Sequence, residues 1–140
     1  MTPLRTLVVG FDASPAASRA MALALAIATP VAARIVLVHA PEGGSIQAQP
    51  TTEEEAGAGE AAVAAAITGW EERARAAGVP FSVVMREEPP GAAILAVARE
   101  VRPELVVVGT RGLRPATKAL LGSVSSLLLA EANRPVLVVP

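Results

Sequence analysis

Five short runs rich in valine, leucine and isoleucine alternate with longer, alanine-rich stretches along the chain. Their spacing predicts five strands, at residues 4–10, 34–39, 80–86, 104–109 and 135–139. The runs Leu7-Val-Val and Leu105-Val-Val-Val lack apolar–polar alternation, which is typical of strands that helices cover on both faces. Strict alternation of strand and helix therefore predicts one α/β domain over residues 1–140, a doubly wound parallel sheet with right-handed crossovers.

Four helices fit between these strands. The first is expected to begin at Ser14-Pro15, an N-cap followed by proline, and to end near residue 30. The second has a possible capping box at residues 52–55, but Gly57 and Gly59 weaken the helix just after it, so its firm part is expected from about Glu60 to Gly78. The third is expected over residues 90–102 and the fourth from about residue 123, while residues 41–51 form a long loop.

Composition narrows the class of protein. With 140 residues, 52% of them hydrophobic and 18% charged, the chain can bury a core. No apolar stretch reaches the roughly 18 residues of a membrane helix and the N-terminus shows no signal-peptide pattern, so we expect a cytoplasmic protein without a membrane partner. The lack of cysteine excludes disulfides and cysteine zinc sites, His39 is the single histidine, and a net charge of −1 argues against nucleic acid.

Positive charge gathers beside a pair of glycines after the fourth predicted strand. Arg111, Arg114 and Lys118 lie in a stretch, residues 105–130, that contains no acidic residue. Gly109 and Gly112 permit positive φ and place no side chain between backbone N–H groups and a ligand. This turn is therefore a candidate anion-binding concavity.

Two further features lie where strands end, the edge at which open parallel sheets bind ligands. A helix opening at Gly122-Ser123 would attract phosphate through its free N–H groups and dipole, and the Ser123 and Ser125 hydroxyls can donate. The alternative is that the glycines only end a strand and that Ser123 is an ordinary N-cap. After the first strand, Asp12 either contacts a ligand or closes an Asx turn before the helix, and both roles can coexist.

The spacing Gly109-x-x-Gly112, nine residues, then Gly122-Ser123 resembles the G-2x-G-9x-G-(S/T) signature of the universal stress protein family. The resemblance extends over the whole chain, through Leu7-Val-Val-Gly-Phe-Asp-Ala-Ser-Pro, Ile35-Val-Leu-Val-His-Ala, Glu104-Leu-Val-Val-Val-Gly-Thr and Arg134-Pro-Val-Leu-Val-Val-Pro. Two departures are Phe11, where a smaller aliphatic residue is usual, and Pro115, which stiffens the nine-residue spacer.

This resemblance implies a five-stranded sheet in the order 3-2-1-4-5 and the binding of ATP, together with Mg²⁺ or Mn²⁺. Asp12 would lie beside the nucleotide, and Ala40 would meet the adenine through its backbone. The first two signature glycines would line the ribose and phosphates, and the third, with the serine after it, would hold the β- and γ-phosphates. The implied ATP-binding set is Asp12, Ala40, Gly109, Gly112, Lys118, Gly122, Ser123, Val124 and Ser125.

The resemblance also implies a homodimer that forms through the last strand, over Val136, Leu137, Val138 and Val139. That strand would be an apolar sheet edge, which is a template for pairing with a second chain. Elsewhere, His39 is interpreted as a packed strand-end residue, because no partner for it is evident from the sequence, and Trp70 as a core residue.

Several nucleotide enzymes are disfavoured by their missing motifs. Lys118 is followed by alanine, so no Walker motif G-x-x-x-x-G-K-(S/T) occurs, and the first loop is not G-x-G-x-x-G. Asp12 is the one evident acidic candidate for a hydrolytic base. We expect an ATP-binding stress-response regulator with slow or no hydrolysis; the alternatives are a weak ATPase or other adenine-nucleotide enzyme, and a dimeric scaffold without a ligand.

Overall fold

The computed structural model describes residues 3–41, 53–110 and 122–140, with residues 53–58 as backbone only. Five parallel strands form one sheet in the order β3-β2-β1-β4-β5, which confirms the expected fold. The strands are β1 (Thr6–Gly10), β2 (Arg34–His39), β3 (Phe81–Met85), β4 (Leu105–Gly109) and β5 (Val136–Val139). The helices are α1 (Pro15–Ala28), the short 3₁₀ turn η1 (Thr29–Val31), α2 (Glu53–Ala76), α3 (Pro90–Val101) and α4 (Ser123–Glu131).

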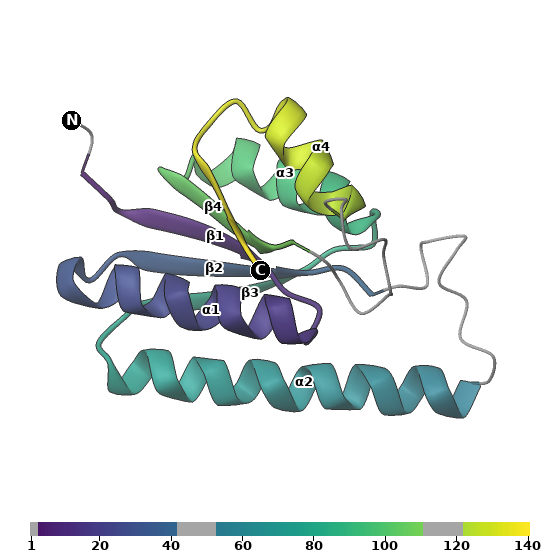
Figure 1. Ribbon diagram of the computed structural model, residues 1–140. Coiled ribbons are helices and arrows are strands. Elements are labelled where there is room, and N and C mark those ends of the chain that lie inside the picture. Colours follow the sequence, from purple (N-terminus) through teal and green to yellow (C-terminus); the bar gives the residue numbers. More distant parts are fainter. Residues whose placement is uncertain (1–2, 42–52, 111–121) are drawn as a thin grey trace.

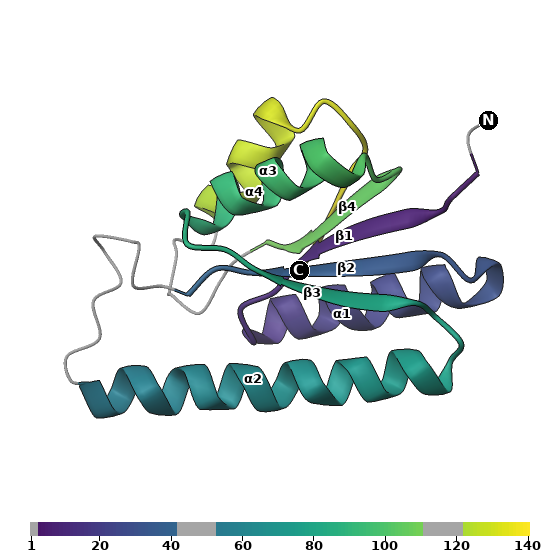
Figure 2. The same ribbon diagram turned by 180° about the vertical axis from the view of Figure 1, so that it is seen from behind.

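Helices cover both faces of the sheet, α1 and α2 on one side and α3 and α4 on the other (Figures 1 and 2). Successive residues of β1 supply the two cores in turn: Leu7 and Val9 belong to the cluster under α1 and α2, and Val8 to the cluster under α3 and α4. All three side chains are fully buried. Burial on both faces explains why these strands show no polar alternation.

Helix α1 begins as its sequence predicts. The Ser14 side chain accepts a hydrogen bond from the Ala17 N–H at 3.1 Å, and Pro15 occupies the first helical position. The helix ends at Ala28 and passes into η1, after which Ala32 adopts a left-handed conformation with φ of 51°.

Helix α2 is longer than its firm predicted part, because it begins at Glu53 and not near Glu60. Alanine and glutamate, both strong helix formers, surround Gly57 and Gly59 and offset the cost of about 1 kcal/mol that each glycine adds. Trp70 is buried as expected, with the Arg73 guanidinium 4.1 Å from the centre of its ring. Residues 42–51 of the loop predicted over 41–51, and the possible cap at Thr52, lie outside the described residues.

The strand order places a switch point between β1 and β4. The chain leaves β1 toward α1 on one face of the sheet, whereas the helix that comes after β4 lies on the opposite face (Figure 1). In open parallel sheets, such a switch point is where ligands bind, outside the carboxyl ends of the strands. None of the described helices is long and apolar enough to cross a bilayer.

Candidate functional site

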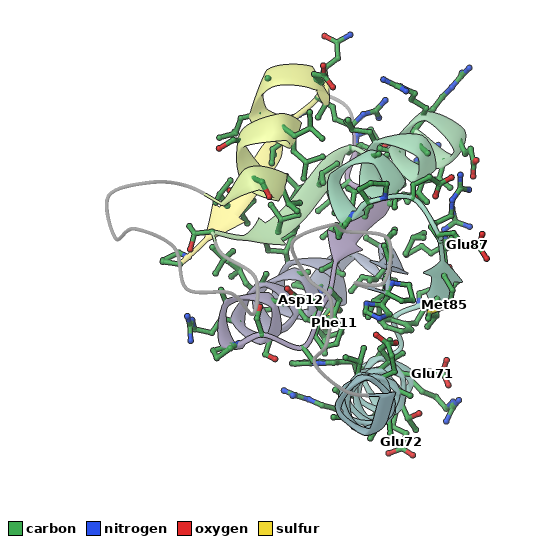
Figure 3. The ribbon with its side chains drawn as sticks, turned by 90° about the vertical axis from the view of Figure 1, so that its right-hand side faces the viewer. Phe11, Asp12, Glu71, Glu72, Met85 and Glu87 are labelled. Carbon is green, nitrogen blue, oxygen red and sulfur yellow. The ribbon has the colours of Figure 1, made fainter. Side chains whose placement is uncertain are left out.

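Asp12 lies at the carboxyl end of β1, in the loop that leads into α1 (Figure 3). Its Oδ1 accepts a hydrogen bond from the Ser14 N–H at 2.9 Å, which confirms the Asx turn as one role of this residue. Ala13 between them has φ of 63°. Among the described residues, Ser14 supplies the one hydrogen bond to this half-buried carboxylate, so the second oxygen is available to a ligand.

Ala40 follows β2, one strand away, and is buried. The β1–β2 ladder ends with the Phe11 N–H donating to the Val38 carbonyl at 3.0 Å, and in a continuing ladder the Ala40 N–H would donate to the Phe11 carbonyl. That bond is not formed. Within the described part of the chain, no hydrogen bond reaches the backbone N–H or C=O of Ala40, which by the ladder's alternation face the β1 side.

Gly109, the last residue of β4, packs against the start of α1. A Cβ added there would lie 2.8 Å from the Ala16 Cβ and 3.0 Å from the Ala17 nitrogen. Gly109 does not use the positive φ that a glycine permits, because Gly78 is the one glycine of the described ranges with φ above zero. The glycine is required for close packing of helix on strand, and this packing holds the Asp12 loop beside the end of β4.

The N-terminus of α4 is fastened to the end of β4. Gly122 donates its N–H to the Thr110 carbonyl at 2.7 Å, and the buried Ser125 hydroxyl donates to the carbonyls of Gly122 and Thr110 at 3.0 and 3.3 Å. Gly122 is the N-cap, so the interpretation of Ser123 as the cap is wrong by one residue, and Ser123 is the exposed first residue of the helix. The first intrahelical bond of this turn is Ser126 N–H to Gly122 O, which leaves the amides of Ser123, Val124 and Ser125 without helical acceptors.

The Ser125 hydroxyl therefore serves the fold, while the Ser125 amide shares the open end of α4 with the amides before it. Gly112 and Lys118, together with the basic residues Arg111 and Arg114, lie outside the described residues, so their predicted roles stay predictions. No cluster of three or more histidine or acidic side chains that could hold a metal ion occurs in residues 3–41, 59–110 and 122–140.

Charged residues rigidify the turn between β3 and α3, next to the end of β2. The Arg86 guanidinium hydrogen bonds both carboxylate oxygens of Glu88, at 2.8 and 3.0 Å, and reaches Glu100 on α3 at 3.3 Å. The hydrogen bond from Arg86 lowers the pKa of Glu88 to about 2. The Arg86 N–H also donates to the His39 carbonyl at 3.0 Å, which joins this turn to β2.

His39 has partners that sequence reasoning missed. As expected, it is a packed strand-end residue, 2% exposed. Its Nδ1 lies 2.8 Å from the Phe11 carbonyl oxygen, and its Nε2 lies 3.2 Å from the Glu60 Oε2 on α2. The one signal in the sequence is the place of Glu60, three residues before Val63 and so on the apolar face of the helix that follows the His39 strand.

The chain matches the family model of the universal stress protein family over residues 3–140. A universal stress protein of Thermus aquaticus is 35% identical, with 96% of this chain and 98% of the relative covered. A universal stress protein of Mycobacterium tuberculosis is 34% identical over 94% of this chain, which spans 44% of that longer protein. A crystal structure of a universal stress protein in complex with cAMP is 30% identical, covers 99% of each chain and has a TM-score of 0.75. The chain belongs to the universal stress protein family.

Proposed function

We propose that this protein binds an adenine nucleotide, ATP in particular, at the carboxyl ends of β1, β2 and β4, and acts in the cytoplasm as a nucleotide-dependent stress-response regulator. The related structure with cAMP, at 30% identity over nearly the whole of both chains, supports the adenine nucleotide as ligand. In this chain, the groups that would bind the nucleotide are Asp12, Ala40 and the start of α4.

The observation that carries the proposal is a set of backbone groups left open along one edge of the sheet. Ala40 offers one N–H and one C=O, the pair that can recognise the edge of an adenine ring. The amides of Ser123, Val124 and Ser125 offer a helix N-terminus, which favours phosphate through its N–H groups and its dipole. Asp12, between these two ends, offers a free carboxylate oxygen to a ribose hydroxyl.

Gly109 keeps the Asp12 loop and the end of β4 close together. Gly112 and Lys118 lie outside the described residues; by their types, the glycine would leave backbone groups accessible and the lysine would supply positive charge to the phosphates. Mg²⁺ or Mn²⁺ would accompany ATP and neutralise part of its charge. Hydrolysis needs a base that activates water beside the γ-phosphate, and Asp12 is the acidic candidate that the sequence offers. Because one oxygen of Asp12 is held in the Asx turn, we expect hydrolysis to be slow or absent.

We further propose that two copies of the chain associate through β5. This strand lies at the sheet edge, and Val136, Leu137 and Val138 are partly exposed there. An apolar edge strand with unpaired backbone groups favours pairing with a second copy.

Isothermal titration calorimetry with paired variants of Gly122 tests nucleotide binding. Gly122 has φ of −66° and ψ of 163°, a backbone that any residue adopts, and asparagine and aspartate are both strong N-caps. Gly122→Asp and Gly122→Asn should therefore keep α4, which thermal unfolding of both variants checks. We expect Gly122→Asp to bind ATP at least about tenfold more weakly than Gly122→Asn, because its carboxylate repels the phosphates.

The unsubstituted protein is expected to bind one ATP per chain. Absence of heat at about 1 mM ATP would favour the ligand-free scaffold. Equal affinities of Gly122→Asn and Gly122→Asp would place the phosphates away from α4.

A further inference from the structure

His39 joins three segments around the proposed site. Its imidazole is buried, with Nδ1 2.8 Å from the carbonyl oxygen of Phe11, the residue before Asp12. A carbonyl oxygen only accepts hydrogen bonds, so Nδ1 must carry a proton. The histidine is thereby fixed as the Nδ1–H form whenever it is neutral.

The opposite ring nitrogen faces a carboxylate. Glu60 on α2 places Oε2 at 3.2 Å and Oε1 at 3.4 Å from the His39 Nε2. A neutral ring with its proton on Nδ1 presents a lone pair at Nε2, and an ionised carboxylate presents another, so the two atoms repel. The contact is favourable when a second proton lies between them, which makes the ring an imidazolium paired with Glu60.

Among the side chains that the structure describes, the other groups around the ring give this proton no competing partner. A cavity of about 170 Å³ beside the imidazole is lined, apart from His39 and Glu60, by uncharged residues, Val63, Ala64 and Ile67 of α2 and Val83 and Met85 of β3. Of the charged residues on neighbouring segments, Arg86 is bonded to Glu88 and Glu100, and Asp12 to the Ser14 N–H. Within the described part of the chain, Glu60 is the charged group that contacts the ring.

The hydrogen bond from His39 goes to the Phe11 carbonyl. If the β1–β2 ladder continued by one more step, the Ala40 N–H would donate to this same carbonyl. With His39 bonded there, the ladder stops at Val38 and the Ala40 backbone stays open. The same imidazole therefore holds the loop that carries Asp12 beside the open backbone of Ala40.

We propose that His39, clamped between the Phe11 carbonyl and Glu60, is a positioning residue that makes nucleotide binding depend on a bound proton. This inference rests on the proposed function. Loss of the Nε2 proton as the pH rises turns the Glu60 contact repulsive, loosens the ring and weakens its hold on the Phe11 carbonyl and hence on the loop that carries Asp12. Affinity for the nucleotide therefore falls as the pH rises.

The variant Glu60→Gln distinguishes an effect of this proton on nucleotide affinity from an effect of the shape of the site. The glutamine amide donates to a neutral Nε2 and accepts from a protonated one, so the clamp forms in both states. Glu72→Gln is the matched control, since Glu72 is exposed on the same helix and lies on the side of α2 away from the sheet (Figure 3). It removes the same charge from α2 without touching His39.

The test is ATP affinity by calorimetry at about pH 6 and pH 8, across the range in which histidine changes charge. The nucleotide's own titration is common to all variants and cancels when they are compared at one pH. We expect the Kd of the unsubstituted protein and of Glu72→Gln to rise about five- to tenfold more over this range than that of Glu60→Gln. Equal pH dependence in all three proteins overturns the positioning role alone, while no ATP binding at either pH overturns the proposed function and this inference together.

Nitrogen-15 NMR gives a readout that needs no ligand, because His39 is the single histidine of the chain. We expect Nδ1 to stay protonated at both pH values and Nε2 to gain its proton toward the lower one. A neutral ring with its proton on Nε2 would contradict the clamp directly.

Discussion

Gly109 shows how one residue meets two demands. It belongs to a signature associated with phosphate binding, yet its missing side chain first allows the opening turn of α1 to contact β4. A Cβ would meet the Ala16 Cβ at 2.8 Å, the Ala16 carbonyl carbon at 2.9 Å and the Ala17 nitrogen at 3.0 Å, none of which can rotate away, because two are backbone atoms and a Cβ is fixed by its backbone. Loss of nucleotide binding in a Gly109 variant would therefore not by itself report a ligand contact.

Two glycine-to-alanine substitutions distinguish the packing role of Gly109 from the general effect of replacing a glycine by alanine. Gly109→Ala is expected to lower the free energy of unfolding by about 1–3 kcal/mol, because α1 must shift to admit the methyl group. Gly69→Ala, in α2, where an added Cβ meets nothing within 4 Å, is expected to raise it by about 0.5–1 kcal/mol. Urea denaturation of both variants measures the difference, and shifts of the same sign would refute the packing role.

The two edge strands differ in what they expose. Strand β3 ends in Met85, which is 55% exposed, and β5 presents a continuous run of aliphatic residues. In β5, the Val139 carbonyl accepts from the Thr110 N–H, so residues 137 and 139 face β4 and the backbone groups of Val138 point outward. The proposed dimer would use these outward groups.

Proline substitutions test that edge. Val138→Pro removes an N–H that faces away from β4, so we expect the dimer to become monomeric while the thermal stability of the monomer changes little. Leu137→Pro removes an N–H on the β4 side and is expected to destabilise the fold itself. Light scattering after size-exclusion chromatography gives the masses; an unsubstituted protein that is monomeric, or a Val138→Pro dimer, would rule out pairing through this strand.

The sequence predicted the strands and most helix boundaries because each depends on local signals, such as the apolar run of β4 or the Ser14-Pro15 start of α1. It misplaced the start of α2, where strong helix formers outweighed two glycines. The pairing of His39 with Glu60 depends on how α2 lies over β2 and β3, which no local pattern encodes. The packing role of Gly109 was hidden for the same reason, since it depends on the distance between α1 and β4.

At the scale of the whole molecule, two covered faces leave the edges of the sheet as the places open to a partner or ligand. The amino ends of the strands are held by fold contacts, such as the Glu104 carboxylate that accepts from the N–H groups of Arg5 and Thr6, which lower its pKa. The carboxyl ends instead gather Asp12, Ala40 and the start of α4 around the switch point, as Figure 3 shows for the Asp12 loop.

The most direct measurement of nucleotide binding at this edge is a titration of the nitrogen-15-labelled protein with ATP, monitored by amide NMR. We expect the largest shifts at the amides of Ala40 and of Ser123, Val124 and Ser125, with small changes at the amino ends of the strands around Thr6 and Glu104. Unchanged spectra at about 1 mM ATP, or shifts confined to residues away from the carboxyl edge of the sheet, would contradict nucleotide binding at this site.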